Sequence, residues 1–339
     1  MNFQWRWLGF AMVSCVFGIA GCGGGPEGGE EIPSERQPEA PAMVSALPEG
    51  AEAMSLLGEP LFPVPAPEEI HSRRMAQLQQ ALRDHEADPG DADALIWAGR
   101  RYAYLGEYRQ AIELFSQGVA GHPNDARFLR HRGHRYISIR EFDRAIEDFR
   151  RAAQLIEGGE DEVEPDGQPN AQGIPTSSLH FNIWYHFGLA HFLKGDFDEA
   201  AEIYRRCMDG SVHPDSKIAT AHWWYMALRR GGREAEAEAM VEGLQLDAWE
   251  PDVIESGSYL QLLRLYEQAG TPEEATLSDF DAETLEGATL GYGIGNFLLY
   301  NGNPDQAREV FEGIIAARGQ WASFGYIAAE ADLARMGST

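Results

Sequence analysis

One stretch, residues 92–125, constrains the fold more than any other part of the chain. Small residues stand at helical spacing where two antiparallel helices could touch, at Gly99 and Ala111, and Phe115 can fill the space beside them. Gly106 can adopt the positive φ that ends a first helix. The stretch is therefore predicted to be a helical hairpin. A hairpin of this kind cannot bury its own apolar faces, so copies of it must stack.

The order of small and aromatic positions in this stretch resembles the tetratricopeptide repeat, a helical hairpin of 34 residues. One small residue of each expected second helix marks the copies: Ala111, Ala145, Ala200, Ala237, Ala275 and Ala307. The resemblance covers about residues 92–335 and implies an all-α fold. This fold is a right-handed α-α superhelix of about six helical hairpins, with a capping helix at each end. Repeats four and five match weakly, and we expect no strands.

The N-terminus has the pattern of an export signal. One cation, Arg6, precedes an apolar run from Leu8 to Ala20 that is too short for a comfortable transmembrane helix. The run ends in Ile19-Ala20-Gly21-Cys22, which resembles the lipobox of bacterial lipoproteins. That resemblance implies a lipid anchor on Cys22 and a place in the bacterial cell envelope. Because Gly23 rather than an aspartate follows, we expect the outer membrane, facing the periplasm. An ordinary secretory signal is the alternative.

Shifts in composition divide the rest of the chain. Glycine, proline and glutamate dominate the residues after Cys22 and recur in the segment between repeats two and three. The expected order is a signal peptide at 1–21, a flexible lipid-anchored tether at 22–66, an N-terminal capping helix at 67–87, repeats one and two at 88–157, an acidic disordered insertion at 158–178, repeats three to six at 179–321, and a C-terminal capping helix at 322–339. Two apolar stretches of the tether, 55–58 and 60–62, could instead dock on the first helix of the array.

The charge balance narrows the class of partner. The chain has 54 aspartates and glutamates against 27 lysines and arginines. A nucleic-acid partner is not expected, because the phosphates require a positive protein face. The membrane is expected to be reached only through the lipid anchor.

The resemblance also implies where a partner binds, because the first helices of tetratricopeptide repeats line a concave groove. The family's groove positions are held here by Arg100, Tyr104, Arg127, Arg130, His134, Asn182, Tyr185, His222, Arg229, Arg264, Tyr292, Asn296 and Tyr300. Arginines bind carboxylates in a bidentate way, and tyrosines supply rigid contact area. The implied partner is a protein or peptide with acidic groups or a free C-terminus. The alternative is that the arginines pair with Glu107, Glu113, Glu141 and Asp148 of neighbouring helices.

Several residues could form a metal, nucleotide or catalytic site, but each of them also has a structural interpretation. His131, His134, His186 and His222 could gather a metal across repeats, which makes a metal-binding protein or hydrolase the alternative function. The glycines of 291–296 fit helix packing better than a nucleotide loop, because no strand is expected before them. Cys207 occupies a position for a small apolar residue, so we expect a buried, inert thiol. No catalytic residue and no cofactor is predicted.

These features together predict a non-enzymatic, membrane-anchored scaffold or adaptor that binds a protein partner in a basic groove. Assembly of envelope complexes is one role that such an adaptor could have. A purely structural spacer is a third interpretation. The acidic insertion could also fold over the groove as an internal mimic of the ligand, a hypothesis that rests on opposite charge alone.

Overall fold

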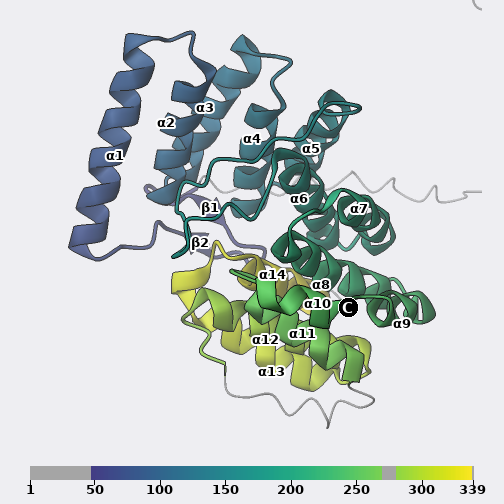
Figure 1. The fold of residues 1–339 in the computed structure, drawn as a ribbon. Coiled ribbons are helices and arrows are strands. Elements are labelled where there is room, and N and C mark those ends of the chain that lie inside the picture. The colour runs from purple at the N-terminus through teal and green to yellow at the C-terminus, as the bar shows by residue number, and fades with distance from the viewer. Residues whose placement is uncertain (1–46, 269–279, 338–339) are drawn as a thin grey trace, which may run out of the picture. The chain divides into compact units, whose positions relative to one another are not determined.

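The computed structural model describes residues 47–268 and 280–337 of the chain. These residues form a helical-hairpin solenoid, which confirms the predicted all-α fold class (Figure 1). Its helices are α1 (Glu68–Ala87), α2 (Ala92–Tyr104), α3 (Tyr108–Gly121), α4 (Ala126–Ser138), α5 (Phe142–Leu155), α6 (Leu179–Lys194), α7 (Phe197–Gly210), α8 (Pro214–Arg230), α9 (Glu234–Glu242), α10 (Leu246–Trp249), η1 (Glu250–Asp252), α11 (Gly257–Gln268), α12 (Leu285–Tyr300), α13 (Pro304–Ala316), η2 (Arg318–Gln320) and α14 (Phe324–Gly337). Among these helices, none is long and apolar enough to cross a membrane.

In four of the hairpins, a glycine of the first helix meets an aromatic ring of the second. A Cβ atom placed on Gly99 would lie 2.4 Å from the ring of Phe115, so no larger residue fits there without a shift. The same contact joins Gly133 to Phe149, Gly188 to Tyr204, and Gly295 to Phe311. The marker alanines are all buried where they are described: Ala111, Ala145, Ala200, Ala237 and Ala307. Ala275 and the expected second helix of repeat five lie outside the described residues.

The turns inside the hairpins need a left-handed backbone conformation, and one of them has an arginine in that place. Gly106, Gly195 and Gly302 have φ values of 82°, 92° and 82°. Arg140 has φ of 67° in the corresponding turn between α4 and α5. A left-handed conformation costs a residue with a side chain about 1–2 kcal/mol. The side chain of Arg140 therefore has to offset this cost through contacts made elsewhere.

The segment before α1 packs against the array over residues 47–66, so the predicted flexible tether is wrong for this part. Its strands β1 (Ala53–Met54) and β2 (Pro60–Leu61) pair antiparallel, which also corrects the expectation of no strands. Ala53 and Leu61 are buried. The Glu52 carboxylate accepts from the Arg109 amide at 2.8 Å. The apolar stretches 55–58 and 60–62 dock on the C-terminal part of the array instead of on its first helix. The Leu56 amide donates to Glu330 Oε1 at 2.7 Å, and the Trp321 indole donates to the Phe62 carbonyl at 2.8 Å. Residues 22–46 lie outside the described residues.

The C-terminal helix α14 is also more deeply buried than the solvated cap that the sequence predicts. It packs against α12, α13 and α6, as Figure 1 shows. Two of its acids, Glu330 and Asp332, are only 1% exposed. Each is neutralised by arginine, because a buried charge without a partner is costly. We call Arg140, Arg230, Glu330, Asp332 and Arg335 the closing cluster.

The closing cluster joins four distant parts of the chain. Arg140 donates from Nη2 to Glu330 Oε2 at 2.8 Å, and the Leu56 amide donates to Glu330 Oε1 at 2.7 Å. Arg230 and Arg335 each donate from Nη2 to Asp332 Oδ1 at 2.8 Å. The N-terminal segment, the second hairpin, α8 and α14 are thereby held together, which brings the two ends of the described array into contact.

Candidate functional site

A small cationic pocket lies on the inner side of the first two hairpins. Its volume is about 130 Å³. We call it the cationic pocket, and it is lined by Arg100, Ala103, Tyr104, Phe115, Arg130, His131, His134, Arg135 and Glu164. Helix α2 contributes Arg100 and Tyr104, helix α4 contributes its two arginines and two histidines, and the insertion between α5 and α6 contributes Glu164.

Capping residues fix the register that turns these side chains inward. Asp91 accepts from the Asp93 amide at 2.9 Å and starts α2, and Asp125 accepts from the Arg127 amide at 3.0 Å and starts α4. Arg100 then comes in the third turn of α2. On α4, residues 130 and 134 are one turn apart and share a face.

The three arginines of the cationic pocket have different contacts. Arg130 Nε lies 2.8 Å from Glu164 Oε2. Arg100 donates from Nη2 to Tyr104 Oη at 3.1 Å and stacks over the Trp97 ring at 4.3 Å. Arg135 lies over the Tyr108 ring at 5.2 Å. Among the described residues, neither Arg100 nor Arg135 forms an ion pair, so the pocket carries more positive than negative charge.

The electrostatics of the pocket follow from burial and crowding. Burial lowers the pKa of Arg135 to about 10, and the nearby Arg130 and Arg100 guanidinium groups act in the same direction. Arg135 therefore stays charged at neutral pH. Burial, and then the neighbouring arginines, also lower the pKa values of His131 and His134 well below the ordinary range. Both imidazoles are neutral at pH 7.

The insertion at 158–178 covers this pocket. Asn182 of α6 donates from Nδ2 to Glu164 Oε2 at 3.1 Å, on the same carboxylate that meets Arg130. A Cβ atom on Gly167 would lie 1.9 Å from Tyr104 Oη, so the backbone of the insertion rests directly on that ring. The Ser216 hydroxyl donates to the Thr176 carbonyl at 2.7 Å. The prediction of a disordered insertion is thus wrong, because the negative charge of the insertion contacts a positively charged surface of the array.

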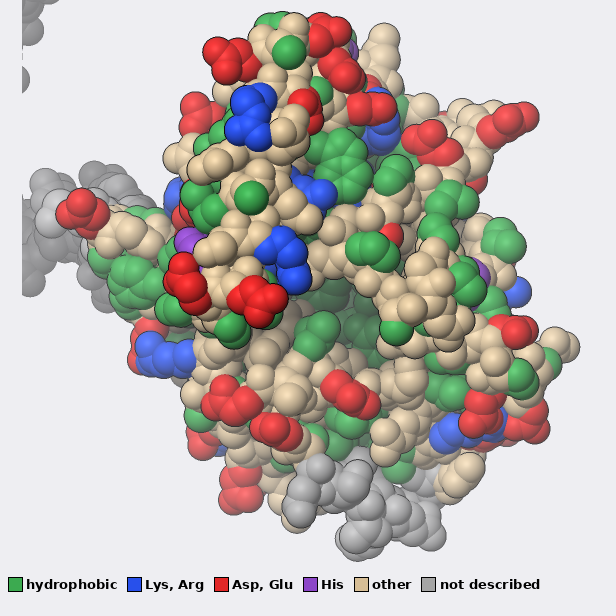
Figure 2. Space-filling model, turned by 60° about the vertical axis from the view of Figure 1, so that its left-hand side comes forward, with side chains coloured by type: hydrophobic (Ala, Val, Ile, Leu, Met, Phe, Trp, Pro, Cys, Tyr) green, Lys and Arg blue, Asp and Glu red, His purple; other side chains and the backbone are tan. Residues whose placement is uncertain are grey.

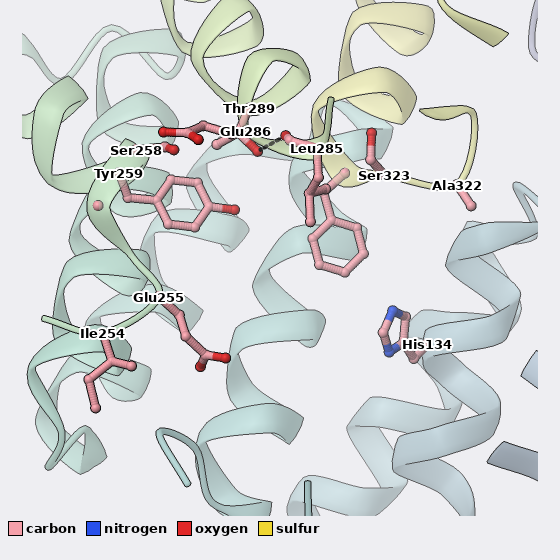
Figure 3. A pocket seen from close by; sticks show the side chains of 12 residues that line it. His134, Ile254, Glu255, Ser258, Tyr259, Leu285, Glu286, Thr289, Ala322 and Ser323 are labelled. Atoms are coloured by element: carbon pink, nitrogen blue, oxygen red, sulfur yellow. Dashed lines mark hydrogen bonds between the residues drawn. The ribbon is translucent and has the colours of Figure 1, made fainter. Parts of the chain in front are cut away.

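A larger cavity of about 580 Å³ adjoins the cationic pocket, and His134 lines both. In Figure 3, the side chains of Glu255 and Tyr259 point into the cavity from one side, and His134 lies across from them. The remaining lining comes from α11, α12 and the start of α14 and includes the exposed Leu285. Figure 2 shows a central hollow in one face of the molecule with hydrophobic side chains in its depth. A cationic compartment therefore leads into one that is partly apolar.

Three of the predicted groove arginines are engaged in surface ion pairs instead of facing a free groove. The partners are Asp93 and Asp125 for Arg127, Glu234 for Arg229, and Asp247, Glu250 and Glu267 for Arg264. Two of the acids named as alternative partners do form ion pairs, Asp148 with Arg132 and Glu141 with Arg144. Neither of these pairs involves a predicted groove arginine.

The other predicted groove residues divide between the pocket and the core. Arg100, Tyr104, Arg130, His134 and Asn182 lie in or beside the cationic pocket. The rest pack in the interior, where their contacts are Tyr259 for Tyr185, Tyr266 for His222, Asp332 for Tyr292, Arg230 for Asn296, and Arg229 for Tyr300. Cys22 lies outside the described residues.

The four histidines of the alternative metal site do not come together as a set of metal ligands in the described residues. The rings of His134 and His186 lie 4.3 Å apart, but His186 Nδ1 is hydrogen-bonded to the Asn182 carbonyl at 2.6 Å. His222 stacks on Tyr259 at 4.7 Å. In residues 47–268 and 280–337, no group of three or more His, Cys, Asp and Glu side chains is placed to hold a metal. The buried thiol at Cys207 is confirmed, and burial raises its pKa to about 12.

Arg135 and Glu164 are site residues that the family's groove positions miss. Arg135 follows His134 directly, one place beyond an expected groove position, and Arg101 stands at the equivalent place in repeat one. Arginine at that place in both repeats was the available signal. For Glu164, the only signal was the acidity of the insertion. The glycines of 291–296 serve packing as expected, since Gly293 lies against Leu262.

Comparisons with known proteins agree with the repeat pattern. The tetratricopeptide repeat family matches residues 98–160 and, through a second family description, residues 181–209. Similar solved structures include MamA, at 19% identity over 52% of this chain and 92% of that chain, with a TM-score of 0.39.

Two further structures are similar to the same extent. YrrB, described as a tetratricopeptide repeat protein with an unusual peptide-binding site, has 13% identity over 71% of this chain and 95% of that chain, with a TM-score of 0.39. A putative kinesin light chain of Podosopora anserina has 16% identity over 68% of this chain and 97% of that chain, with a TM-score of 0.38. No curated protein sequence matches the chain significantly.

Proposed function

We propose that this chain, which matches the tetratricopeptide repeat family over residues 98–160 and 181–209, is a non-enzymatic scaffold that binds a peptide segment of a protein partner. The site is the cationic pocket together with the adjoining cavity. Stacked repeats present extended inner surfaces that suit peptide segments. Peptide segments with both an acidic group and apolar side chains match the two compartments.

The observation that supports this function most is the uncompensated charge of the cationic pocket. Three arginines face a single carboxylate there, and Arg100 and Arg135 lack ion-pair partners among the described residues. An arginine fork binds a carboxylate through two parallel hydrogen bonds, with a geometry that a purely structural role does not need. The cavity of about 580 Å³ beside it has room for apolar side chains of the same segment.

A crosslinking pull-down with matched variants tests the proposal. The full chain would be compared with Arg100→Gln and Arg135→Gln, which remove charge inside the pocket. Arg205→Gln removes an equal charge on α7, where the side chain is exposed and pairs with Glu202 of its own helix. We expect one partner to be captured by the full chain and by the control, and to be lost from both pocket variants. Capture that is equal in all four proteins would contradict the proposed site.

We also propose that the scaffold is held to the bacterial cell envelope by a lipid on Cys22, at the outer membrane facing the periplasm. The pattern Ile19-Ala20-Gly21-Cys22 after an apolar run supports this. Two or three acyl chains anchor a protein stably, at about 0.8 kcal/mol for each buried methylene. Metabolic labelling with a fatty acid should mark the wild-type chain and not Cys22→Ser. Label retained by the variant would rule out this anchor.

A further inference from the structure

We propose that Glu164 is an intramolecular substitute for an oxyanion of the partner peptide. Arg100, Arg130 and Arg135 then form a site for a carboxylate or phosphate group, and the insertion has to leave the pocket before the peptide binds. This inference rests on the proposed function and adds to it the chemical class of the ligand and a competition built into the chain.

The contacts of Glu164 show that the pocket already recognises a carboxylate. Arg130 Nε and Asn182 Nδ2 both approach Glu164 Oε2, at 2.8 and 3.1 Å. The second oxygen, Oε1, lies 3.9 Å from His131 Nε2. The side chains of Glu164 and Arg130 are each 10% exposed. This is a desolvated, charge-assisted contact of the kind that a bound peptide carboxylate makes.

The pocket is not saturated by Glu164. Arg100 meets a neutral hydroxyl, and the contact of Arg135 is with the face of the Tyr108 ring, without an ion pair to any described residue. Burying guanidinium groups without counter-charge is unfavourable, so an additional or stronger anion stabilises the pocket. The free volume of about 130 Å³ beside Glu164 is on the order of four water molecules. An oxyanion attached to a peptide also needs the place that the Glu164 carboxylate occupies against Arg130.

The insertion is held in a way that allows it to leave. Its apolar side chains contribute little to the core, since Val163 is 64% exposed and Ile174 is 45% exposed. It is attached mainly by polar contacts such as the hydrogen bond from the Leu179 amide to the Glu162 carbonyl at 2.9 Å. Segments with few buried apolar contacts open at low free-energy cost. Displacing Glu164 therefore leaves the packed hairpins intact.

Calorimetric titration of the full chain with inorganic phosphate, and separately with succinate, tests the competition at constant ionic strength. In Glu164→Gln, the internal competitor loses its charge, and we expect the dissociation constant of at least one probe to fall about tenfold, or ~1.4 kcal/mol. Glu160→Gln is the control, because Glu160 is exposed on the same insertion. Preference for succinate identifies a peptide carboxylate, and preference for phosphate identifies a phosphorylated residue.

A second variant, which changes no charged residue, tests the same competition in case Glu164→Gln fails to fold. In Gly167→Val, the new side chain meets Tyr104 and Arg100 and should lift the insertion from the pocket. Its affinity for the preferred probe should also rise, while Gln172→Val at an exposed position should not change it. Hydrogen exchange at the Leu179 amide should accelerate when the probe binds.

The competition is overturned if Glu164→Gln and Gly167→Val bind both probes with wild-type affinity, or if no form of the chain binds either probe. The proposed function fails separately, when capture of the partner is insensitive to Arg100→Gln and Arg135→Gln. One mixed outcome is possible: the arginine variants lose the partner, but Glu164→Gln binds both probes with wild-type affinity. This result would support the scaffold proposal and contradict the competition.

Discussion

The closing cluster and the cationic pocket both bury arginines, but they treat the charge differently. In the closing cluster, each acid of α14 is hydrogen-bonded by arginine, and Glu330 also accepts from the Leu56 amide. In the cationic pocket, three arginines line the same space as Glu164, but only Arg130 pairs with it, and that acid comes from an insertion instead of a packed helix. In the closing cluster, every arginine pairs with an acid on α14, and this holds the array closed. In the cationic pocket, unpaired arginines beside a detachable segment are suited to binding.

This difference leads to opposite expectations for substitutions. Removing one member of a balanced, buried pair leaves the other charge without compensation, which lowers stability strongly. Removing an arginine from an unbalanced group relieves repulsion and costs little. Stability should therefore depend on the closing cluster, and binding should depend on the cationic pocket.

The largest effect is expected for Glu330→Ala. The variant leaves Arg140, which is 3% exposed on its side chain, without its carboxylate, and it removes the acceptor for the Leu56 amide. The free energy of unfolding should fall by about 3–5 kcal/mol in urea denaturation at pH 7. Glu312→Ala on the exposed face of α13 is the control and should change it by less than about 0.5 kcal/mol.

A double-mutant cycle locates the origin of that loss. Arg140→Gly relieves the strained φ of 67° but breaks the same pair. If the pair carries the effect, the Glu330→Ala, Arg140→Gly double variant should be more stable than the sum of the single losses predicts. Strictly additive losses would show that Glu330 and Arg140 act independently and would contradict the role assigned to the closing cluster.

A smaller effect, about 2–3 kcal/mol, is expected for Asp332→Asn, with a pH dependence that identifies its cause. Burial alone would raise the pKa of Asp332, but Arg230 and Arg335 outweigh it and hold the pKa below its ordinary value. A carboxyl with a depressed folded pKa contributes stability above its unfolded pKa, and this contribution is lost as the pH falls through the folded value.

The gap in unfolding free energy between wild type and Asp332→Asn should therefore stay constant from pH 8 to 5 and narrow below about pH 4. Asp143→Asn is the matched control, since Asp143 forms an exposed ion pair with Lys194 at 2.7 Å. Asp143→Asn should lower the free energy of unfolding by no more than about 1 kcal/mol. A gap that persists unchanged into strong acid would mean that packing, and not charge, is lost in Asp332→Asn.

The repeat pattern could be predicted from sequence because it depends on neighbours within one hairpin. Gly99 and Phe115 are close along the chain, and their contact recurs with the period of the repeat. The closing cluster could not be predicted in this way. Arg140 and Glu330 are 190 residues apart, and nothing in the local pattern of either one names the other. The positive φ of Arg140 also occupies a place where the pattern requires glycine, so that local rule failed at a functional contact.

The candidate site was predicted in part, for the same reason. Arg100, Arg130 and His134 follow from the register of the first helices, which capping fixes locally. Whether an inward arginine is free or paired depends on segments that arrive from elsewhere, such as Glu164 from the insertion. Arg127 is the opposite case. It also occupies an expected groove position, but Asp93 and Asp125 form ion pairs with it and neutralise its charge.

The pocket's excess charge should also be visible in the titration of its histidines. The pKa of His134 is lowered by burial first and then by Arg135 and its neighbours. Arg135→Gln should therefore raise the pKa of His134, measured from ring resonances by NMR between pH 4 and 8. The pKa of His222, which burial alone lowers to about 3, is the internal reference and should not move.

The same histidines determine whether the free energy of unfolding rises or falls in acid. Unfolded histidine binds a proton near pH 6.5, whereas folded His134 resists it, so stability is complete above that pH and declines as the pH falls. The decline is about 1.4 kcal/mol per pH unit for each such residue, and for His134 it should end at a higher pH in Arg135→Gln. An identical His134 titration in both proteins would mean that Arg135 contributes no field at the pocket.

The smallest effect on stability is expected for Arg135→Gln itself at pH 7, within about 0.5 kcal/mol of wild type. Arg135 forms no ion pair in the described residues, and burial with two neighbouring guanidinium groups already disfavours its charge, which lowers its pKa to about 10. Chemical denaturation would measure the change, and Arg230→Gln in the closing cluster should lose several times more. A loss in Arg135→Gln as large as in Arg230→Gln would place Arg135 among the structural charges, and the contrast between the two clusters would no longer hold.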